Sequence, residues 1–176
     1  GNTYSDKQSV NNLVTTNNGT ITLTAQWTAI RYSIQYIAND GTSTTDTQGG
    51  FVYDTADNLK NNPFTRTGYT FAGWNTEDDG SGTSYANKAE VKNLASTNGA
   101  TVKLYAQWTA NTYTIKFAAN GGTGSMSDLT MTYGTAKNLT ANVFTKTGYT
   151  FNGWKDSNGN TYSDKQSVNN LVTTNN

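Results

Sequence analysis

The chain offers few residues of the kinds that carry out chemistry. Its 176 residues include no cysteine and no histidine, which excludes disulfides, thiolate metal sites and imidazole bases or ligands. The densest carboxylate cluster, Glu77-Asp78-Asp79, has the residue types of a glycosidase pair or a calcium loop. Its counterpart reads Lys155-Asp156-Ser157, and the spacing and final glutamate of a calcium loop are missing. We interpret the cluster as a solvated loop and expect no catalytic residue, no metal site and no cofactor.

The aromatic residues are the other candidates for a binding role. Stacked sugars often rest on tryptophan, and the chain has four: Trp27, Trp74, Trp108 and Trp154. Each lies in register with the core-facing positions of an expected strand, so core packing is the favoured interpretation. Tyr105 is the better candidate for an exposed platform because it alternates with core-facing neighbours, but its counterpart is Thr24. The sequence therefore assigns no ligand-binding residue.

A lysine–asparagine isopeptide bond is a third kind of chemistry to consider in a chain without cysteine. Lysine and asparagine recur at matching positions, namely Lys7, Lys88 and Lys165, and Asn12, Asn93 and Asn170. Such a bond also needs a neighbouring acid in the core. Glu90 aligns with Ser9 and Ser167, so no acid recurs there, and we favour the absence of the cross-link.

Internal repeats organise the whole chain. Three segments recur at offsets of 80 or 81 residues: 32–41 with 113–122, 64–74 with 144–154, and 20–28 with 101–109. Residues 1–18 are identical to residues 159–176, two units away, whereas the middle counterpart from Gly82 differs. We infer a longer array whose units alternate between two sequence types; a separate duplication of the end segment is the alternative.

The hydrophobic pattern of one unit predicts four strands. Aromatic and β-branched residues alternate with polar ones at 32–36 and 113–117, and hairpin partners are expected near 50–53 and 129–133. The segments GYTFAGW and GYTFNGW predict a third strand, with a bulge or close backbone approach at Gly73. Alternation is clearest in the closing strands, at 21–27 and 102–108. Residues 55–64 fit either one helical turn or an irregular segment, and 75–84 fit an exposed loop.

Each unit also contains a pattern that predicts one short helix. Apolar residues stand at i, i+3 and i+4 in all three copies: Val10, Leu13 and Val14; Val91, Leu94 and Ala95; Val168, Leu171 and Val172. Together with the four strands, this pattern predicts an α+β unit of about 80 residues. Linkers of four residues, at 28–31 and 109–112, predict a semi-stiff chain of units.

The chain resembles the Listeria–Bacteroides repeat, or internalin B-repeat, family. The resemblance rests on YTIKFAANGG, GYTFNGW and LYAQWT, which occur in that order and cover essentially the whole chain. It implies a tandem-repeat protein of the bacterial cell surface, a β-grasp-like (ubiquitin- or SUMO-like) fold for each unit, and a stalk or adhesive role. It implies no catalytic residues.

The family's boundaries divide the chain into three pieces. Residues 1–31 are the last part of a preceding repeat plus a linker, 32–112 are a complete repeat plus a linker, and 113–176 lack their final strand. A missing strand leaves an unpaired sheet edge that favours pairing with another chain. Either the terminal pieces are poorly ordered, or the strand at 19–27 of one molecule completes residues 113–176 of another. A folding unit permuted relative to the family's boundaries is the third possibility.

These observations predict a structural protein and not an enzyme. We expect a stalk or spacer and adhesion module, located outside the cell at a bacterial surface. The alternatives are a module that binds carbohydrate or glycoprotein, and a self-assembling fibre unit. Expected partners are neighbouring repeats, with a second copy or a host or cell-surface glycan or protein as further candidates. A pI near 6.4 without a basic run argues against nucleic acid, and no apolar stretch approaches 18 residues, which predicts no membrane span in this segment.

Overall fold

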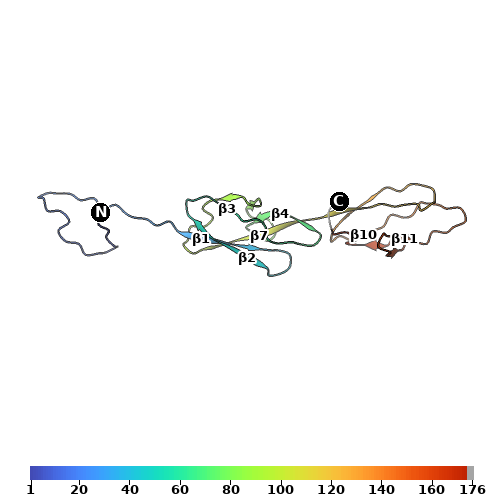
Figure 1. The fold of residues 1–176 in the computed structure, drawn as a ribbon, viewed down its shortest axis with the longest axis horizontal. Helices are drawn as coiled ribbons and strands as arrows, with labels where there is room; N and C mark the ends of the chain where they lie inside the picture. Colours follow the sequence, from blue (N-terminus) through green and yellow to red (C-terminus); the bar gives the residue numbers. More distant parts are fainter. Residues whose placement is uncertain (174–176) are drawn as a thin grey trace.

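A computed structural model describes residues 1–173 and shows an elongated molecule (Figure 1). Three parts follow one another along its long axis. We call them the N-terminal segment (residues 1–30), the complete repeat (residues 31–110) and the open repeat (residues 112–173). Hydrophobic residues form one core cluster in the complete repeat and a second, separate cluster in the open repeat. The predicted boundaries at 31 and 112 are not tested by this arrangement and stay predictions.

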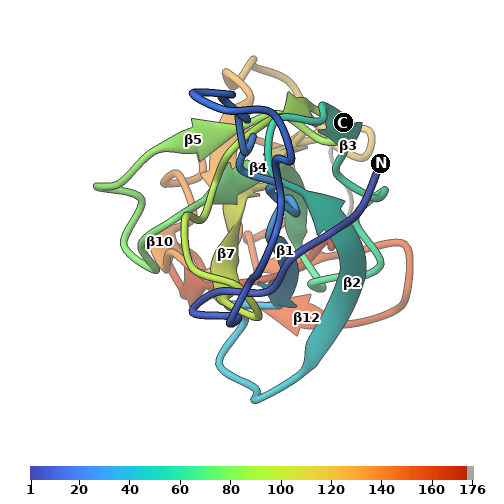
Figure 2. The same ribbon diagram turned by 90° about the vertical axis from the view of Figure 1, so that its left-hand side faces the viewer.

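The complete repeat is built on one mixed five-stranded sheet. Its strands are β1 (Arg31–Ile37), β2 (Thr45–Val52), β4 (Tyr69–Asn75), β5 (Ser84–Tyr85) and β7 (Thr101–Ala110), in the order β2-β1-β7-β4-β5. The central pair β1 and β7 is parallel, and every other pair is antiparallel. In the end-on view of Figure 2, β2 and β5 lie at the two edges. Two short strands, β3 (Asp57–Asn58) and β6 (Glu90–Val91), pair beside this sheet.

Alternation along β1 decides which residues enter the core of the complete repeat. Tyr32, Ile34 and Tyr36 are buried, whereas their neighbours in sequence are only partly covered. They pack with residues from the other strands and from the segment after β3: Phe51, Leu59, Trp74, Val91, Leu104 and Ala106. Aromatic pairs contribute much of this contact, since the Tyr36 and Trp74 rings lie 4.7 Å apart. The predicted hairpin between the first two strands is confirmed.

Gly73 forms the predicted irregularity in β4. The pairing of β4 with β7 shifts register between Phe71 and Gly73, so that one extra residue lies on β4. Gly73 has a φ of 145°, and a Cβ there would lie 3.0 Å from the carbonyl oxygen of Tyr85. Only glycine accommodates both the conformation and the close approach.

The open repeat contains only two-stranded pairs. β8 (Thr112–Ile115) pairs with β9 (Leu129–Thr132), β10 (Lys137–Asn138) with β13 (Ser167–Val168), and β11 (Trp154–Lys155) with β12 (Thr161–Tyr162). Its buried residues are Tyr113, Leu129, Met131, Leu139 and Val168. The predicted hairpin of this copy is therefore present, but the five-stranded sheet is not.

The expectation of an α+β, β-grasp-like unit with one helix per repeat is wrong, because residues 1–173 contain strands and turns but no helix. The apolar stripe has another cause. Val91 belongs to β6, and Asn93 has a φ of 57°, a left-handed conformation that a right-handed helix does not contain. Asn12 and Asn170 have the same conformation, each with a φ of 54°. With no helix in the described part of the chain, none is long and apolar enough to cross a membrane. Residues 55–64 likewise form β3 and irregular chain, not a helical turn.

The predicted closing strand at 21–27 is also absent from the structure. The N-terminal segment forms no strand, and Ile21, Leu23 and Trp27 are 46%, 59% and 91% exposed. The prediction that Trp27 packs in a core is therefore wrong for this chain. A strand needs a neighbour for its backbone hydrogen bonds, and the segment has none, whereas its counterpart β7 lies between β1 and β4.

Candidate interaction site

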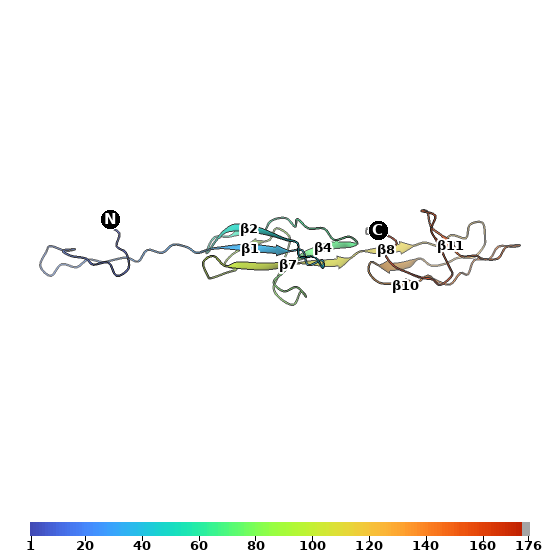
Figure 3. The same ribbon diagram turned by 90° about the horizontal axis from the view of Figure 1, so that it is seen from below.

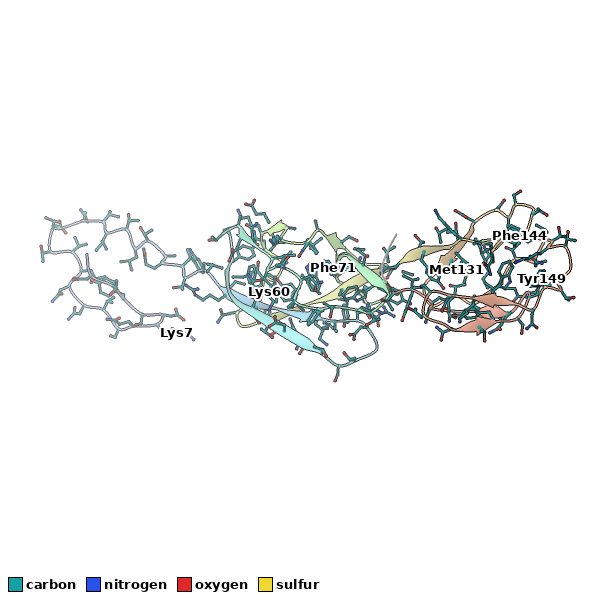
Figure 4. All side chains as sticks on the ribbon, turned by 45° about the vertical axis from the view of Figure 1, so that its right-hand side comes forward. Lys7, Lys60, Phe71, Met131, Phe144 and Tyr149 are labelled. Atoms are coloured by element: carbon teal, nitrogen blue, oxygen red, sulfur yellow. The ribbon has the colours of Figure 1, made fainter. Side chains whose placement is uncertain are left out.

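The open repeat contains a groove of about 1090 Å³, which is the main candidate site of the chain. We call it the open groove. Its apolar lining includes Ile115, Phe117, Phe144, Phe151, Trp154 and Tyr162. Figure 4 labels Phe144 and Tyr149 at this end of the molecule, with Met131 closer to the complete repeat. Aromatic side chains are thus the largest apolar groups of the lining.

The open groove lies where β7 lies in the complete repeat. There β7 pairs with β1 from Ser33↔Thr101 to Ile37↔Tyr105, and with β4 from Tyr69↔Ala110 to Asn75↔Tyr105. The counterparts of these β1 and β4 residues are 114–118 and 149–155. In the described residues no strand pairs with 114–118 on the side away from β9. The open groove thus lies between two segments whose counterparts in the complete repeat both pair with β7.

Aromatic residues of the open groove are more exposed than their counterparts in the complete repeat. Tyr149 is 72% exposed and Phe151 is 40% exposed, whereas their counterparts Tyr69 and Phe71 are half-buried. Trp154 is half-buried, but its counterpart Trp74 is fully buried. Single exposed apolar residues are ordinary on a protein surface. The exposed Tyr149 and Phe151 stand at positions whose counterparts, Tyr69 and Phe71, pair with β7 in the complete repeat.

Four charged residues line the open groove, namely Lys116, Lys146, Lys155 and Asp156. The Lys146 ammonium lies 4.6 Å from the centre of the Tyr149 ring and donates to the carbonyl oxygen of Asn120 at 3.3 Å. The Tyr162 hydroxyl donates to Asp156 Oδ2 at 2.9 Å. Hydrogen bonds from Asn160 and then Tyr162 lower the pKa of Asp156, and the bond to Asp156 raises the pKa of Tyr162. Lys146, Asp156 and Tyr162 thus already have partners within the open repeat.

The indole nitrogen of Trp154 is buried without a hydrogen-bond partner, which raises the question of a missing ligand. Trp74 in the complete repeat has the same unpartnered nitrogen. Both indoles are surrounded by other aromatic rings. The ring centres of Phe117 and Phe151 each lie 4.8 Å from that of Trp154. The feature recurs where the groove is filled, so it belongs to the fold and does not mark a ligand.

The acidic loop predicted to be solvated is exposed at Glu77, Asp78 and Asp79. Its backbone is tied to the sheet, since the Asp78 carbonyl accepts from Asn39 Nδ2 at 2.8 Å. Hydrogen bonds from Ser81 lower the pKa of Asp79. Nowhere in residues 1–173 do three or more acidic side chains gather as a metal site.

The residue that organises this loop was not identified from the sequence. Asn75 is buried at the end of β4, and its side chain both donates hydrogen bonds to the loop that follows and accepts one from it. Its Nδ2 donates to Gly80 O at 3.0 Å and Ser84 Oγ at 2.9 Å, and its Oδ1 accepts from Glu77 N at 2.9 Å. A polar residue that ends an alternating strand, just before a glycine-rich loop, was the available signal.

The recurring lysines and asparagines are turn residues in the structure. Lys88 and Lys165 are exposed, with φ of 60° and 58°. Asn93 Oδ1 accepts from Asp54 N at 2.6 Å, and Asn170 Oδ1 accepts from Gly134 N at 2.6 Å. Asn93 therefore links the turn after β6 to the turn after β2, and Asn170 links the turn after β13 to the turn after β9. The buried lysine that an isopeptide bond requires is not at these positions.

The predicted core packing of the tryptophans is confirmed at Trp74. Trp108 is half-buried and its Nε1 donates to the Ala38 carbonyl at 2.7 Å, which attaches the end of β7 to the end of β1. Tyr105, the candidate exposed platform, is half-buried.

A second interaction surface joins the complete repeat to the open repeat at Asn111, which is 6% exposed. Asn111 N donates to Gly68 O at 2.8 Å, and Tyr133 N donates to Asn111 O at 2.8 Å. The Asn111 side chain accepts from Thr70 Oγ1 and donates to Thr173 O, each at 2.8 Å. Beside it the rings of Tyr69 and Tyr133 meet edge to face at 5.6 Å. One buried residue thus bonds to both repeats.

Comparisons with known proteins agree with the internal repeats. The sequence profile of the Listeria-Bacteroides repeat domain matches residues 32–107 and again residues 113–176. A protein of Evansella cellulosilytica named "Putative Gly-rich membrane protein" is 37% identical over 139 residues, covering 76% of this chain and 15% of that protein. A second protein of the same organism, named "Putative membrane protein", is 37% identical over 93 residues, covering 52% of this chain and 13% of that protein. The chain therefore spans about one seventh of the length of these relatives. No solved structure matches the chain.

Proposed function

Because the chain belongs to the Listeria-Bacteroides repeat domain family, we propose that it is a spacer segment of a longer repeat protein at a bacterial surface. Its task is to hold other parts of that protein at a distance. The family is a repeat domain and not a known enzyme family. The proposal places the chain outside the cell, in a protein that the membrane anchors, and the names of the two relatives support this location.

The junction at Asn111 is the observation that carries this proposal. A spacer must transmit direction from one repeat to the next. β7 ends at Ala110 and β8 begins at Thr112, so a single residue separates two strands that belong to different repeats. Asn111 is buried and bonded to both repeats, and Tyr69 and Tyr133 pack beside it. A junction of this kind favours a fixed orientation between neighbouring repeats over free movement about a flexible linker.

Composition supports the same role. The chain has no cysteine or histidine and a formal net charge of zero. Its exposed faces are rich in threonine and asparagine. Such a surface carries no redox or acid–base chemistry near neutral pH and no strong field that would attract charged partners.

An adhesion role through stacked sugars has less support. The most exposed aromatic residues, Trp27 and Tyr149, have half-buried counterparts at Trp108 and Tyr69. Their exposure arises from the absence of a strand and does not recur as a face of each repeat. A glycan array would test adhesion separately, with binding abolished by Tyr149→Ala as the supporting result.

Spin-label distances across the junction test the spacer proposal. The chain has no cysteine, so Lys103→Cys on β7 and Thr130→Cys on β9 can be labelled specifically, and both residues are exposed. We expect one narrow distance distribution, which Asn111→Gly broadens because it removes both side-chain hydrogen bonds. A distribution in the unaltered junction as broad as in the Asn111→Gly variant would contradict the proposal. Lys103→Cys with Glu90→Cys, both within the complete repeat, controls for label motion.

A further inference from the structure

The turn that precedes β7 holds the start of β1 by two hydrogen bonds. Asn98 Oδ1 accepts from Arg31 N at 3.0 Å, and Gly99 N donates to Arg31 O at 2.7 Å. Figure 3 shows β1 and β7 side by side in the complete repeat, and their parallel pairing begins at Ser33↔Thr101. The Asn98-Gly99 pair therefore extends this contact back to Arg31, the first residue of β1.

The same two groups are the ones that react when an asparagine deamidates beside a glycine. The Gly99 nitrogen attacks Cγ of the Asn98 side chain, and the new C–N bond closes a five-membered imide. The bond from Cγ to the side-chain nitrogen breaks, and that nitrogen leaves as ammonia with the proton from Gly99 N. Water then opens the imide at one of its two carbonyls and gives aspartate or isoaspartate. Glycine leaves the path of attack open because it has no Cβ, and no atom lies within 4 Å of a Cβ built at Gly99.

Both reacting groups are occupied while the repeat is folded. The Gly99 N–H points at Arg31 O, and the Arg31 N–H holds the side chain of Asn98, so the nitrogen cannot turn towards Cγ without breaking a hydrogen bond. Asn98 and Gly99 are exposed, so water reaches them, and hydrogen bonds instead of burial hold the reaction back. Local separation of β1 from the turn frees both groups at once.

We infer that Asn98-Gly99 is a spontaneous modification site that is closed while Arg31 is bound and opens when the start of β1 separates from the turn. This inference does not depend on the spacer role. Aspartate keeps a side-chain oxygen that accepts from Arg31 N, so this product restores the contact. Isoaspartate adds one carbon to the main chain and moves Gly99 N away from Arg31 O. Opening of the repeat is therefore recorded as a permanent change in the chain.

Two substitutions of Arg31 test the inference through the rate of deamidation at Asn98. Arg31→Pro removes the N–H that holds the Asn98 side chain, and proline is tolerated at the first residue of a strand. Arg31→Ala is the matched control, because it keeps the N–H and changes only an exposed side chain. We expect deamidation about fivefold faster in Arg31→Pro, as for the loss of one hydrogen bond, and an unchanged rate in Arg31→Ala.

Peptide mapping by mass spectrometry, after incubation of the full chain at mildly alkaline pH, measures these rates. Trypsin isolates the site in residues 93–103 and a second Asn-Gly pair, Asn158-Gly159, in residues 156–165. Fragment masses locate the change at Asn98, and an isoaspartyl methyltransferase quantifies the isoaspartate. Asn158 lies in the open repeat between β11 and β12, so its rate should be the same in both Arg31 variants.

Hydrogen exchange of the Gly99 amide is an independent measurement, because exchange and deamidation need the same opening. In urea below the unfolding transition, both rates should rise together in the unaltered chain, and full unfolding should raise the Asn98 rate about tenfold or more. This comparison holds even where Arg31→Pro destabilises the whole repeat. Equal Asn98 rates in the folded and unfolded chain, equal rates in Arg31→Pro and Arg31→Ala, or deamidation that stays constant while Gly99 exchange accelerates would overturn the inference.

Discussion

Replacing Leu104 by alanine tests whether the closing strand supplies the core of a repeat. Leu104 on β7 is fully buried, and Leu23, at the equivalent position of the N-terminal segment, is 59% exposed. Removing a fully buried leucine lowers the free energy of unfolding by about 3 kcal/mol, through lost burial and the cavity left behind. Removing the exposed leucine should change it by less than about 0.5 kcal/mol. The two substitutions are chemically identical, so the difference isolates the contribution of the sheet around β7.

Urea denaturation followed by tryptophan fluorescence measures this difference. Trp27→Phe and Trp154→Phe in the background leave Trp74 and Trp108, which report on the complete repeat. We expect Leu104→Ala to lower the melting temperature by about 12 °C or more, at about 4 °C or more per kcal/mol for a domain of this size. Losses that agree within about 1 kcal/mol for Leu104→Ala and Leu23→Ala would refute the assignment of β7 as the core strand.

Three further substitutions test particular contacts in the complete repeat, each by the urea midpoint. Gly73→Ala should lower the free energy of unfolding by about 1–3 kcal/mol, because Gly73 has a positive φ and a close backbone contact. Gly49→Ala is the control and should lower it by under about 1 kcal/mol, since no atom lies within 4 Å of a new Cβ there. Equal losses for the two variants would contradict the bulge. Asn93→Gly keeps the left-handed turn but loses two hydrogen bonds to Asp54, so it should lower the free energy of unfolding by about 1 kcal/mol. Asn93→Ala should lower it further, because alanine is strained at the positive φ of this position. The reverse order would contradict the turn assignment. Burial raises the pKa of Tyr36 to about 12. The folded state therefore holds this proton more tightly than the unfolded chain, so stability should fall as the pH rises from 10 towards 12. Tyr36→Phe should flatten that fall, and an unchanged profile would contradict it.

Strands with simple alternation could be predicted from the sequence because the signal is local. In β1 every second residue is apolar, and the structure buries those residues. The helix failed for a related reason. Val91 and Leu94 have helical spacing, but Asn93 between them adopts a left-handed conformation and bonds to Asp54, 39 residues earlier. A three-residue apolar stripe cannot distinguish one helical turn from a short strand followed by a turn.

In the candidate sites too, features that follow from the repeat spacing could be predicted, whereas features that depend on tertiary contacts could not. The positions equivalent to the neighbours of β7 could be found from the repeat offset alone, and in the open repeat they line a groove that contains aromatic residues. The roles of Asn75 and Asn111 could not be predicted. Asn75 organises a loop by bonds over five to nine residues, and Asn111 bonds to Gly68, 43 positions earlier, and to Tyr133, 22 positions later. Among 24 asparagines, only the tertiary partners distinguish these two.

The parallel pairing of β1 with β7 decides how the chain responds to mechanical force. Tension applied along the chain enters the complete repeat at Arg31, the start of β1, and leaves at Ala110, the end of β7. The two strands are then pulled in opposite directions along their length, so the hydrogen bonds between Ser33↔Thr101 and Ile37↔Tyr105 are sheared together instead of being unzipped one by one. Such a repeat should extend at high force in a single step.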